Sequence, residues 1–125
     1  MIRDRIPQIV AIGFGLFNLV IGLWAFFDPQ SFFDELAVFP PYNEHFLHDV
    51  GAFQIGIGAT LLLGLVWRSD ALLTVLAGAG VGAFVHWVAH VRDTGLGGRD
   101  SDPYSLGSLA AVVIVAAAWR WRTQR

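Results

Sequence analysis

Four long stretches without Asp, Glu, Lys or Arg dominate this chain of 125 residues. They cover residues 6–27, 50–67, 71–91 and 105–119. An α-helix needs about 20 apolar residues to cross a bilayer, because every backbone polar group must be satisfied within the segment. The second stretch reaches this length if its helix begins near Glu44, and the fourth if its helix covers residues 103–121. The sequence therefore predicts an all-α protein, a four-transmembrane-helix bundle that forms a single domain over residues 1–125.

The composition agrees with this fold class and excludes several functions. Hydrophobic residues make up 55% of the chain and charged residues 14%, against about 25% charged residues in soluble domains. The chain has no cysteine, which excludes disulfides, thiolate metal sites and thiol redox chemistry. The net charge of −2 gives no basis for binding nucleic acid. The expected partner is the lipid bilayer, with another membrane subunit or a second copy of the chain as an open alternative.

The arginines predict the orientation of the chain in the membrane. With four crossings, Arg92 and Arg99 lie on one side, and six arginines share the other: Arg3, Arg5, Arg68, Arg120, Arg122 and Arg125. Because positively charged loops normally stay in the cytoplasm, we expect a multi-pass protein of the cell membrane with both termini cytoplasmic. Eight of the ten acidic residues then fall on the outer side. We expect the first stretch to persist as a helix, since it offers no small-residue cleavage site.

Capping residues predict where the helices begin. Asp70 is expected to cap a helix that starts at the next residue, and Asn43 to cap the second spanning helix. In the first outer loop, Ser31 followed by Asp34 is typical of a helix start. Aromatic residues follow Ser31, so we expect a short helix lying at the membrane interface in this loop.

All four histidines fall on the predicted outer side: His45, His48, His86 and His90. Residues four apart share a helix face, and one such row on the third stretch is Thr74, Gly78, Gly82, His86 and His90. A similar row on the second stretch is His48, Ala52, Gly56 and Thr60. Because small residues in membrane helices usually mark close contact with a neighbour, these rows aim the histidines into the bundle. We expect His48 and His86 to form the deeper layer, and His45 and His90 the shallower one.

Three interpretations of this histidine cluster remain open. In the first, the imidazoles bind zinc, copper or iron, with Glu44, Asp49 and Asp93 as further ligands or as partners that orient the rings. In the second, two histidines hold haem b, although the glycine rows imply helices too close for the macrocycle. In the third, the polar side chains only bond one another and water, and titration of the imidazoles at about pH 6.5 could serve as a pH sensor.

Two amides at similar depth form a separate prediction. Asn18 lies in the first stretch and Gln54 in the second. A hydrogen bond between these side chains would satisfy both amides and would contribute about 1 kcal/mol in lipid. We expect this polar pair to be structural.

The segment HDVGAFQIGIGA, residues 48–59, resembles one helix of small four-helix membrane proteins of the DoxX-like type. Those proteins often carry a polar and a charged residue, then a small residue, then spaced glycines. The resemblance covers this segment and the overall architecture. Some such proteins accompany quinone-linked oxidoreductases, so the resemblance implies an accessory role more than independent catalysis. It does not extend to the histidines, whose role rests on the residues alone.

These observations predict a small integral membrane protein with a histidine-lined polar pocket at the extracytoplasmic face. The pocket would bind a metal ion or a small ligand, as an accessory to a redox or envelope system. One alternative is a structural or interaction subunit of a membrane complex, without a ligand. Another is a membrane enzyme that depends on a histidine-bound metal, although no nucleophile–base pair in the sequence is specific enough to name a reaction.

Overall fold

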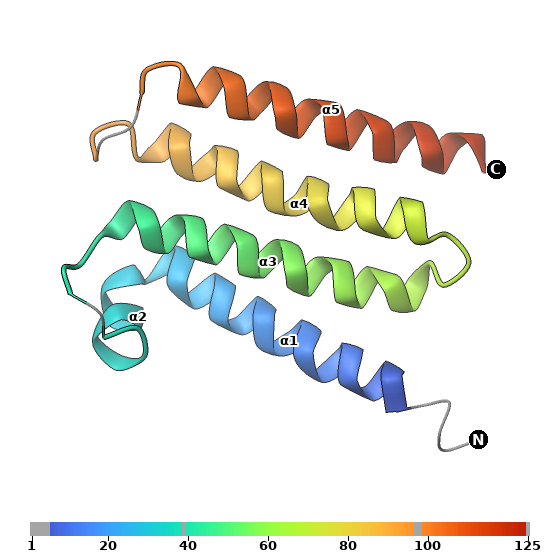
Figure 1. Ribbon diagram of the computed structural model, residues 1–125, viewed down its shortest axis with the longest axis horizontal. Coiled ribbons are helices and arrows are strands. Elements are labelled where there is room, and N and C mark those ends of the chain that lie inside the picture. The colour runs from blue at the N-terminus through green and yellow to red at the C-terminus, as the bar shows by residue number, and fades with distance from the viewer. Residues whose placement is uncertain (1–5, 39, 97–98, 125) are drawn as a thin grey trace.

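The computed structural model describes residues 6–38, 40–96 and 99–124, which form five α-helices and no strand. The helices are α1 (Ile6–Phe27), α2 (Pro29–Glu35), α3 (Glu44–Val66), α4 (Ala71–Arg92) and α5 (Asp102–Thr123) (Figure 1). Four of them, α1, α3, α4 and α5, are long and apolar enough to cross a membrane. The predicted all-α class and the four spans are therefore confirmed, together with the short helix in the first connection.

The caps of the spanning helices agree with the sequence. The side chain of Asn43 accepts a hydrogen bond from the backbone N–H of Phe46 at 3.0 Å, at the start of α3. The side chain of Asp70 accepts one from the N–H of Leu73 at 3.0 Å, at the start of α4. Each cap satisfies a backbone donor that the first helical turn leaves free.

The short helix α2 begins earlier than predicted. Its cap is Asp28 rather than Ser31, and the Asp28 carboxylate accepts from the backbone N–H of Ser31 at 3.3 Å. Pro29 is well suited to the first helical position because its missing N–H would have no partner there. The Ser31 hydroxyl instead accepts from the indole N–H of Trp24 at 3.2 Å. This bond ties α2 to the end of α1.

The four spans lie side by side in one layer, in the order α1, α3, α4, α5 (Figure 1). Each span packs mainly against its neighbours in that order. At the end of α1, Phe26 also reaches α4, where it packs with Ala89 and lies 5.4 Å below the guanidinium of Arg92. The short α2 contacts α1 and α3. The bundle is therefore an open row with two apolar faces, and α5 at its edge buries only Ala110.

Glycines set the close spacing of the spans. Between α1 and α3, a Cβ on Gly22 would lie 2.8 Å from the carbonyl oxygen of Gly51. Between α3 and α4, a Cβ on Gly56 would lie 2.9 Å from the Cα of Gly82. The small-residue rows of the second and third stretches thus face each other, as the sequence indicated, and they bring the histidines of the two helices together.

Asn18 has a different partner from the one predicted. Its side-chain amide donates to the carbonyl of Phe14 on the same helix at 2.7 Å, and Asn18 is 6% exposed. Among the hydrogen bonds of the described residues, none joins it to Gln54. A carbonyl one turn earlier on its own helix is always in reach, whereas a bond to Gln54 requires a particular register between two helices.

The two ends of the layer differ in character. One end of the layer holds the start of α1, the end of α5 and the turn between α3 and α4 (Figure 1). There, Nε of Arg120 lies 3.2 Å from Oδ2 of Asp70, which joins α5 to the turn before α4. The opposite end carries α2, the α4–α5 connection and all four histidines, and we call it the histidine end.

Candidate metal centre at the histidine end

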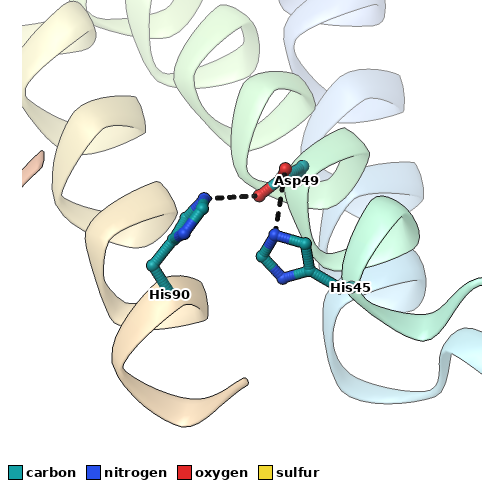
Figure 2. Close-up of side chains that lie close together, drawn as sticks. All are labelled: His45, Asp49 and His90. Carbon is teal, nitrogen blue, oxygen red and sulfur yellow. Dashed lines mark ion pairs between the residues drawn. The ribbon is translucent and has the colours of Figure 1, made fainter. Parts of the chain in front are cut away.

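Asp49, in the second turn of α3, lies among three of the four histidines. Its Oδ1 is 3.2 Å from Nε2 of His86 and 3.8 Å from Nε2 of His90, both on α4. Its Oδ2 is 3.6 Å from Nε2 of His45, one turn earlier on α3. Figure 2 shows the carboxylate between His45 and His90. Asp49 therefore gathers imidazole nitrogens from two adjacent helices.

The Oδ1 atom of Asp49 is buried and accepts no hydrogen bond from the described residues. Nε2 of His86 lies 3.2 Å away and forms an ion pair with this oxygen only when the imidazole is protonated. A buried carboxylate oxygen without a partner is strongly destabilising. A cation bound here would offset the desolvation cost of this oxygen, so Oδ1 of Asp49 favours an ion-binding site.

The spacing of the nitrogens and the oxygen fits a small ion. Nε2 of His86 and Nε2 of His90 lie 3.2 Å apart. Together with Oδ1 of Asp49 they form a triangle with edges of 3.2, 3.2 and 3.8 Å. Ligands at about 2.0–2.1 Å from a tetrahedral zinc ion are about 3.3 Å from one another. His45, Asp49 and His90 also offer ligand atoms that all lie within 4.8 Å of one another. Asp49 and His90 therefore belong to two candidate sets of three, one with His86 and one with His45.

Carboxylates also face the far nitrogens of two of these rings. Nδ1 of His45 is 2.9 Å from Oδ2 of Asp93, and Nδ1 of His90 is 4.0 Å from Oδ2 of Asp102. A proton on Nδ1 of His45 bonds to Asp93 and leaves Nε2 with the lone pair that binds a metal. The contact of His90 with Asp102 is too long for a hydrogen bond and is electrostatic only. Asp93 thus lies where the sequence expected a ring-orienting carboxylate. Asp102, the first residue of α5, was missed, and the only signal for it was the excess of acidic residues in the outer loops.

His48 takes no part in the contacts of Asp49 and instead shares Asp93 with His45. It is 2% exposed, its Nδ1 lies 2.6 Å from Oδ2 of Asp93, and its Nε2 lies 4.0 Å from Oε1 of Glu44. Its ring packs on Phe26 of α1, with centroids 5.3 Å apart. His48 and His86, which the sequence placed in one deeper layer, do not contact each other among the described interactions, because Asp49, one residue further round α3, lies beside His86. Of the predicted ligands, Glu44 contacts only His48.

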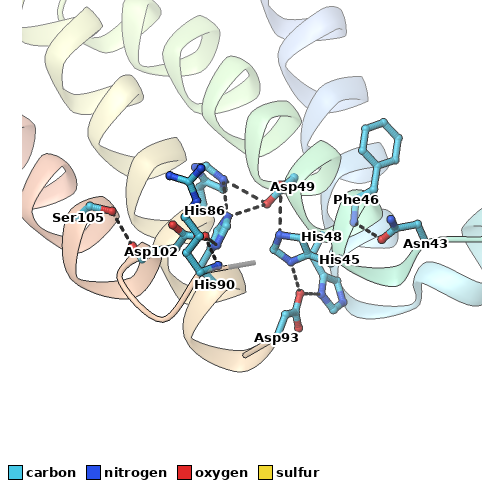
Figure 3. A network of polar contacts seen from close by, with 11 residues as sticks. Asn43, His45, Phe46, His48, Asp49, His86, His90, Asp93, Asp102 and Ser105 are labelled. Carbon is cyan, nitrogen blue, oxygen red and sulfur yellow. Dashed lines mark hydrogen bonds and ion pairs between the residues drawn. The ribbon is translucent and has the colours of Figure 1, made fainter. Parts of the chain in front are cut away.

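Asp93 links the two histidines of α3 to the end of α4 (Figure 3). Burial by itself favours the neutral acid, since Asp93 is 6% exposed. The hydrogen bonds with His48 and His45 outweigh burial and hold the pKa of Asp93 below its ordinary value. The ionised carboxylate therefore accepts from both rings and fixes their orientation.

A small polar pocket lies beside His45 and His90 at the histidine end. Its volume is about 30 Å³, and its lining includes two histidines, three carboxylates and one guanidinium: His45, His90, Asp93, Asp100, Asp102 and Arg99. This is room for a water molecule or a small ion but not for an organic cofactor. The rings of His45 and His90 also meet edge to face with centroids 4.5 Å apart, which leaves no space for haem between them.

Comparisons with protein-family models, with curated proteins and with solved structures find no match to this chain. The geometry of the histidine end therefore carries the functional argument.

Proposed function

We propose that this membrane protein binds a divalent transition-metal ion, zinc in the first place, at its histidine end. Asp49, His86 and His90 are the central ligands, and His45 completes the set. The observation that carries the proposal is the buried Oδ1 of Asp49, which accepts no hydrogen bond from the described residues and lies beside two imidazole nitrogens at the spacing of zinc ligands. Zinc suits a tetrahedral set of imidazole and carboxylate ligands without sulfur, and copper and iron are the nearest alternatives.

The arginine distribution supports an extracytoplasmic position for this site. The polar pocket would then open to the outside of the cell membrane, so the ion would be taken from the external medium. A site of this kind is consistent with an accessory component of a redox or envelope system. The DoxX-like resemblance of residues 48–59 supports the same role, in which the ion is held for a partner rather than used in independent catalysis.

A second candidate is a structural or interaction subunit without a ligand. It is favoured by one specific observation: Asp93 accepts from His45 and His48 at 2.9 and 2.6 Å and so joins α3 to α4 without any ion. This network accounts for His48, Asp93 and one nitrogen of His45. It leaves the buried Oδ1 of Asp49 without a hydrogen bond, and for this reason we prefer the metal site.

Metal analysis of purified protein distinguishes the two candidates. Wild-type protein, prepared without a histidine tag in mild detergent and dialysed against zinc, is expected to retain about one ion per chain. Asp49→Asn is expected to retain none, because the amide lacks the negative charge of the carboxylate ligand. Glu44→Gln is the matched control, since Glu44 lies five residues earlier on α3, is 46% exposed and contacts His48 only. Wild-type protein without bound zinc, or an Asp49→Asn variant that keeps its zinc, would contradict the proposal.

A further inference from the structure

An apolar groove between α4 and α5 ends at an arginine, at the end of the layer opposite the histidines. Its volume is about 640 Å³. It is lined by Leu72 and Leu76 of α4 and by residues of α5 between Ala111 and Thr123. Among the described residues that line it, Arg120 is the only one that carries a charge. We call it the α5 groove.

The α5 groove has about the length of one leaflet of a bilayer. Ala111 and Thr123 are twelve residues apart on α5, which is about 18 Å along a helix. The hydrocarbon core of a bilayer is about 30 Å thick, so one leaflet contributes about 15 Å. Arg120 lies three residues before Thr123, the last residue of α5. Next to it, Trp119 is 71% exposed and lines the groove, and tryptophan is typical of the level where lipid head groups begin. The groove therefore extends from that level toward the middle of the bilayer.

A buried carboxylate holds the guanidinium of Arg120 in place. Nε of Arg120 lies 3.3 and 3.2 Å from Oδ1 and Oδ2 of Asp70, whose side chain is 7% exposed. The side chain of Arg120 is 39% exposed, and its two terminal nitrogens donate no hydrogen bond to a described residue. The N–H groups on these nitrogens are therefore available to an anion, and their planar arrangement matches the oxygens of a phosphate.

The charges around Arg120 favour an anion even though Asp70 pairs with it. The Asp70 carboxylate also accepts from the N–H of Leu73 at the start of α4, where the positive end of the helix dipole compensates part of its charge. Arg68 and Arg122 lie at the same end of the layer, so the described part of this end carries three arginines against one aspartate. A lipid phosphate brought to this end therefore meets an excess of positive charge.

Three other grooves of the described chain differ in this respect. Those of about 450 and 530 Å³ have no arginine in their lining. A groove of about 320 Å³ reaches Arg68, but this side chain is exposed, and its Nε donates to the carbonyl of Leu65 on its own helix at 3.1 Å. The α5 groove combines an apolar length of one leaflet with a guanidinium that a second helix holds in position, and these three grooves do not.

We propose that the α5 groove binds one anionic phospholipid from the leaflet at this end of the layer. Its phosphate contacts the terminal nitrogens of Arg120, and an acyl chain lies along α5. Asp70 then has two roles, because it caps α4 and also orients the guanidinium that receives the phosphate. The inference is independent of the metal centre, which lies at the opposite end. The bound lipid would cover part of α5, which itself buries only Ala110.

Native mass spectrometry tests this inference. The protein is equilibrated in mild detergent with equal amounts of phosphatidylglycerol and phosphatidylcholine that carry the same acyl chains, and the lipids that stay bound are identified. Wild-type protein is expected to keep about one phosphatidylglycerol per chain and to prefer it about tenfold, because only this lipid has a net negative charge. Arg120→Gln is expected to abolish the preference. Arg122→Gln is the matched control, since it removes the same charge one turn away at a residue that does not line the groove.

A second pair of variants leaves Arg120 and Asp70 intact, so it reports on the groove without disturbing the ion pair. Ala111 is exposed and lines the α5 groove, and Ala111→Phe is expected to reduce the retained phosphatidylglycerol several-fold, because the ring fills space that the acyl chain would cover. Ala118→Phe is its control: Ala118 is also exposed on α5 but lines the 450 Å³ groove, so the retained lipid is expected to stay unchanged.

Three outcomes would overturn the inference. If wild-type protein retains the two lipids equally, the groove holds only bulk lipid. If Arg120→Gln prefers phosphatidylglycerol as strongly as Arg122→Gln does, or Ala111→Phe retains as much of it as Ala118→Phe, the lipid follows the general charge of this end and does not occupy the groove. If the protein appears as a dimer without bound lipid, a second copy of the chain covers the groove instead.

Discussion

At the scale of single residues, Asp49 and Asp93 have opposite surroundings. Asp93 accepts from two imidazoles, whereas one oxygen of Asp49 is buried without a hydrogen bond. The sequence placed both carboxylates beside the histidines but could not tell which would be central. That distinction depends on the rotation of α3 by a single residue, which turns Asp49 rather than His48 toward His86. It depends equally on the end of α4, which places Asp93 over His45 and His48.

The lowered pKa of Asp93 predicts an acid-sensitive contribution to stability. Its folded-state pKa lies below the ordinary value of 3.8, so the folded state favours the ionised form. The resulting stabilisation is fully present above about pH 3.8 and is lost as the pH falls from there through the lower folded-state value. Asp93→Asn is expected to lower the free energy of unfolding by roughly 1–2 kcal/mol at neutral pH. The free energy of unfolding of this variant is also expected to decrease less than that of wild type as the pH falls below about 3.8.

Unfolding in detergent, followed by circular dichroism as a function of pH, measures this effect. Asp34→Asn is the control, because Asp34 is an exposed carboxylate on α2 that bonds only Gln30. If the free energy of unfolding falls with acid pH equally in Asp93→Asn and in wild type, Asp93 does not contribute in this way.

At the scale of elements, the contact of α3 with α4 positions the ligands. The sequence predicted this contact from its rows of small residues, and it also predicted the caps at Asn43 and Asp70. It misplaced the start of α2, because the Asp28 carboxylate is also a good cap and Pro29 favours the first helical position. It mispaired Asn18, since hydrophobic patterns do not fix the register between α1 and α3 closely enough to choose a hydrogen-bond partner.

Gly56→Ala tests whether this helix contact supports the metal site. The added Cβ would lie 2.9 Å from the Cα of Gly82, so the two backbones must move apart. We expect a loss of stability of about 1–3 kcal/mol, typical of overpacking, and weaker zinc binding, because the ligands come from both helices. Gly13→Ala is the matched control, since a Cβ there meets nothing within 4 Å. Zinc titration of the two variants measures the difference, and equal affinities would mean that the spacing of α3 and α4 does not govern the site.

At the scale of the whole molecule, the spans form an open layer with a polar cluster at one end. Length and hydropathy were sufficient to predict four spans and one shared side for the histidines. They could not predict an open row, because both faces of each span are apolar and lipid covers an exposed face as well as a helix does. The asymmetry of the arginines predicts an orientation in which the histidine end lies outside the cytoplasm.

Single-cysteine labelling tests this orientation, and the absence of native cysteine makes the background low. Ser101→Cys lies at the histidine end, just before α5, and is expected to react with a membrane-impermeant maleimide added to intact cells. Ser69→Cys lies in the turn between α3 and α4 and is expected to react only after the membrane is permeabilised. Labelling of Ser69→Cys in intact cells would reverse the orientation and place the metal site in the cytoplasm.

The central claim is that an ion is held by imidazoles of two helices together with Asp49. X-ray absorption at the zinc edge of the loaded protein, in detergent and without a tag, measures the ligands directly. We expect nitrogen and oxygen ligands at about 2.0–2.1 Å, with the outer-shell scattering of imidazole, and a loss of imidazole scattering in His86→Ala. A spectrum of oxygen ligands alone, without imidazole scattering and unchanged in His86→Ala, would contradict the account.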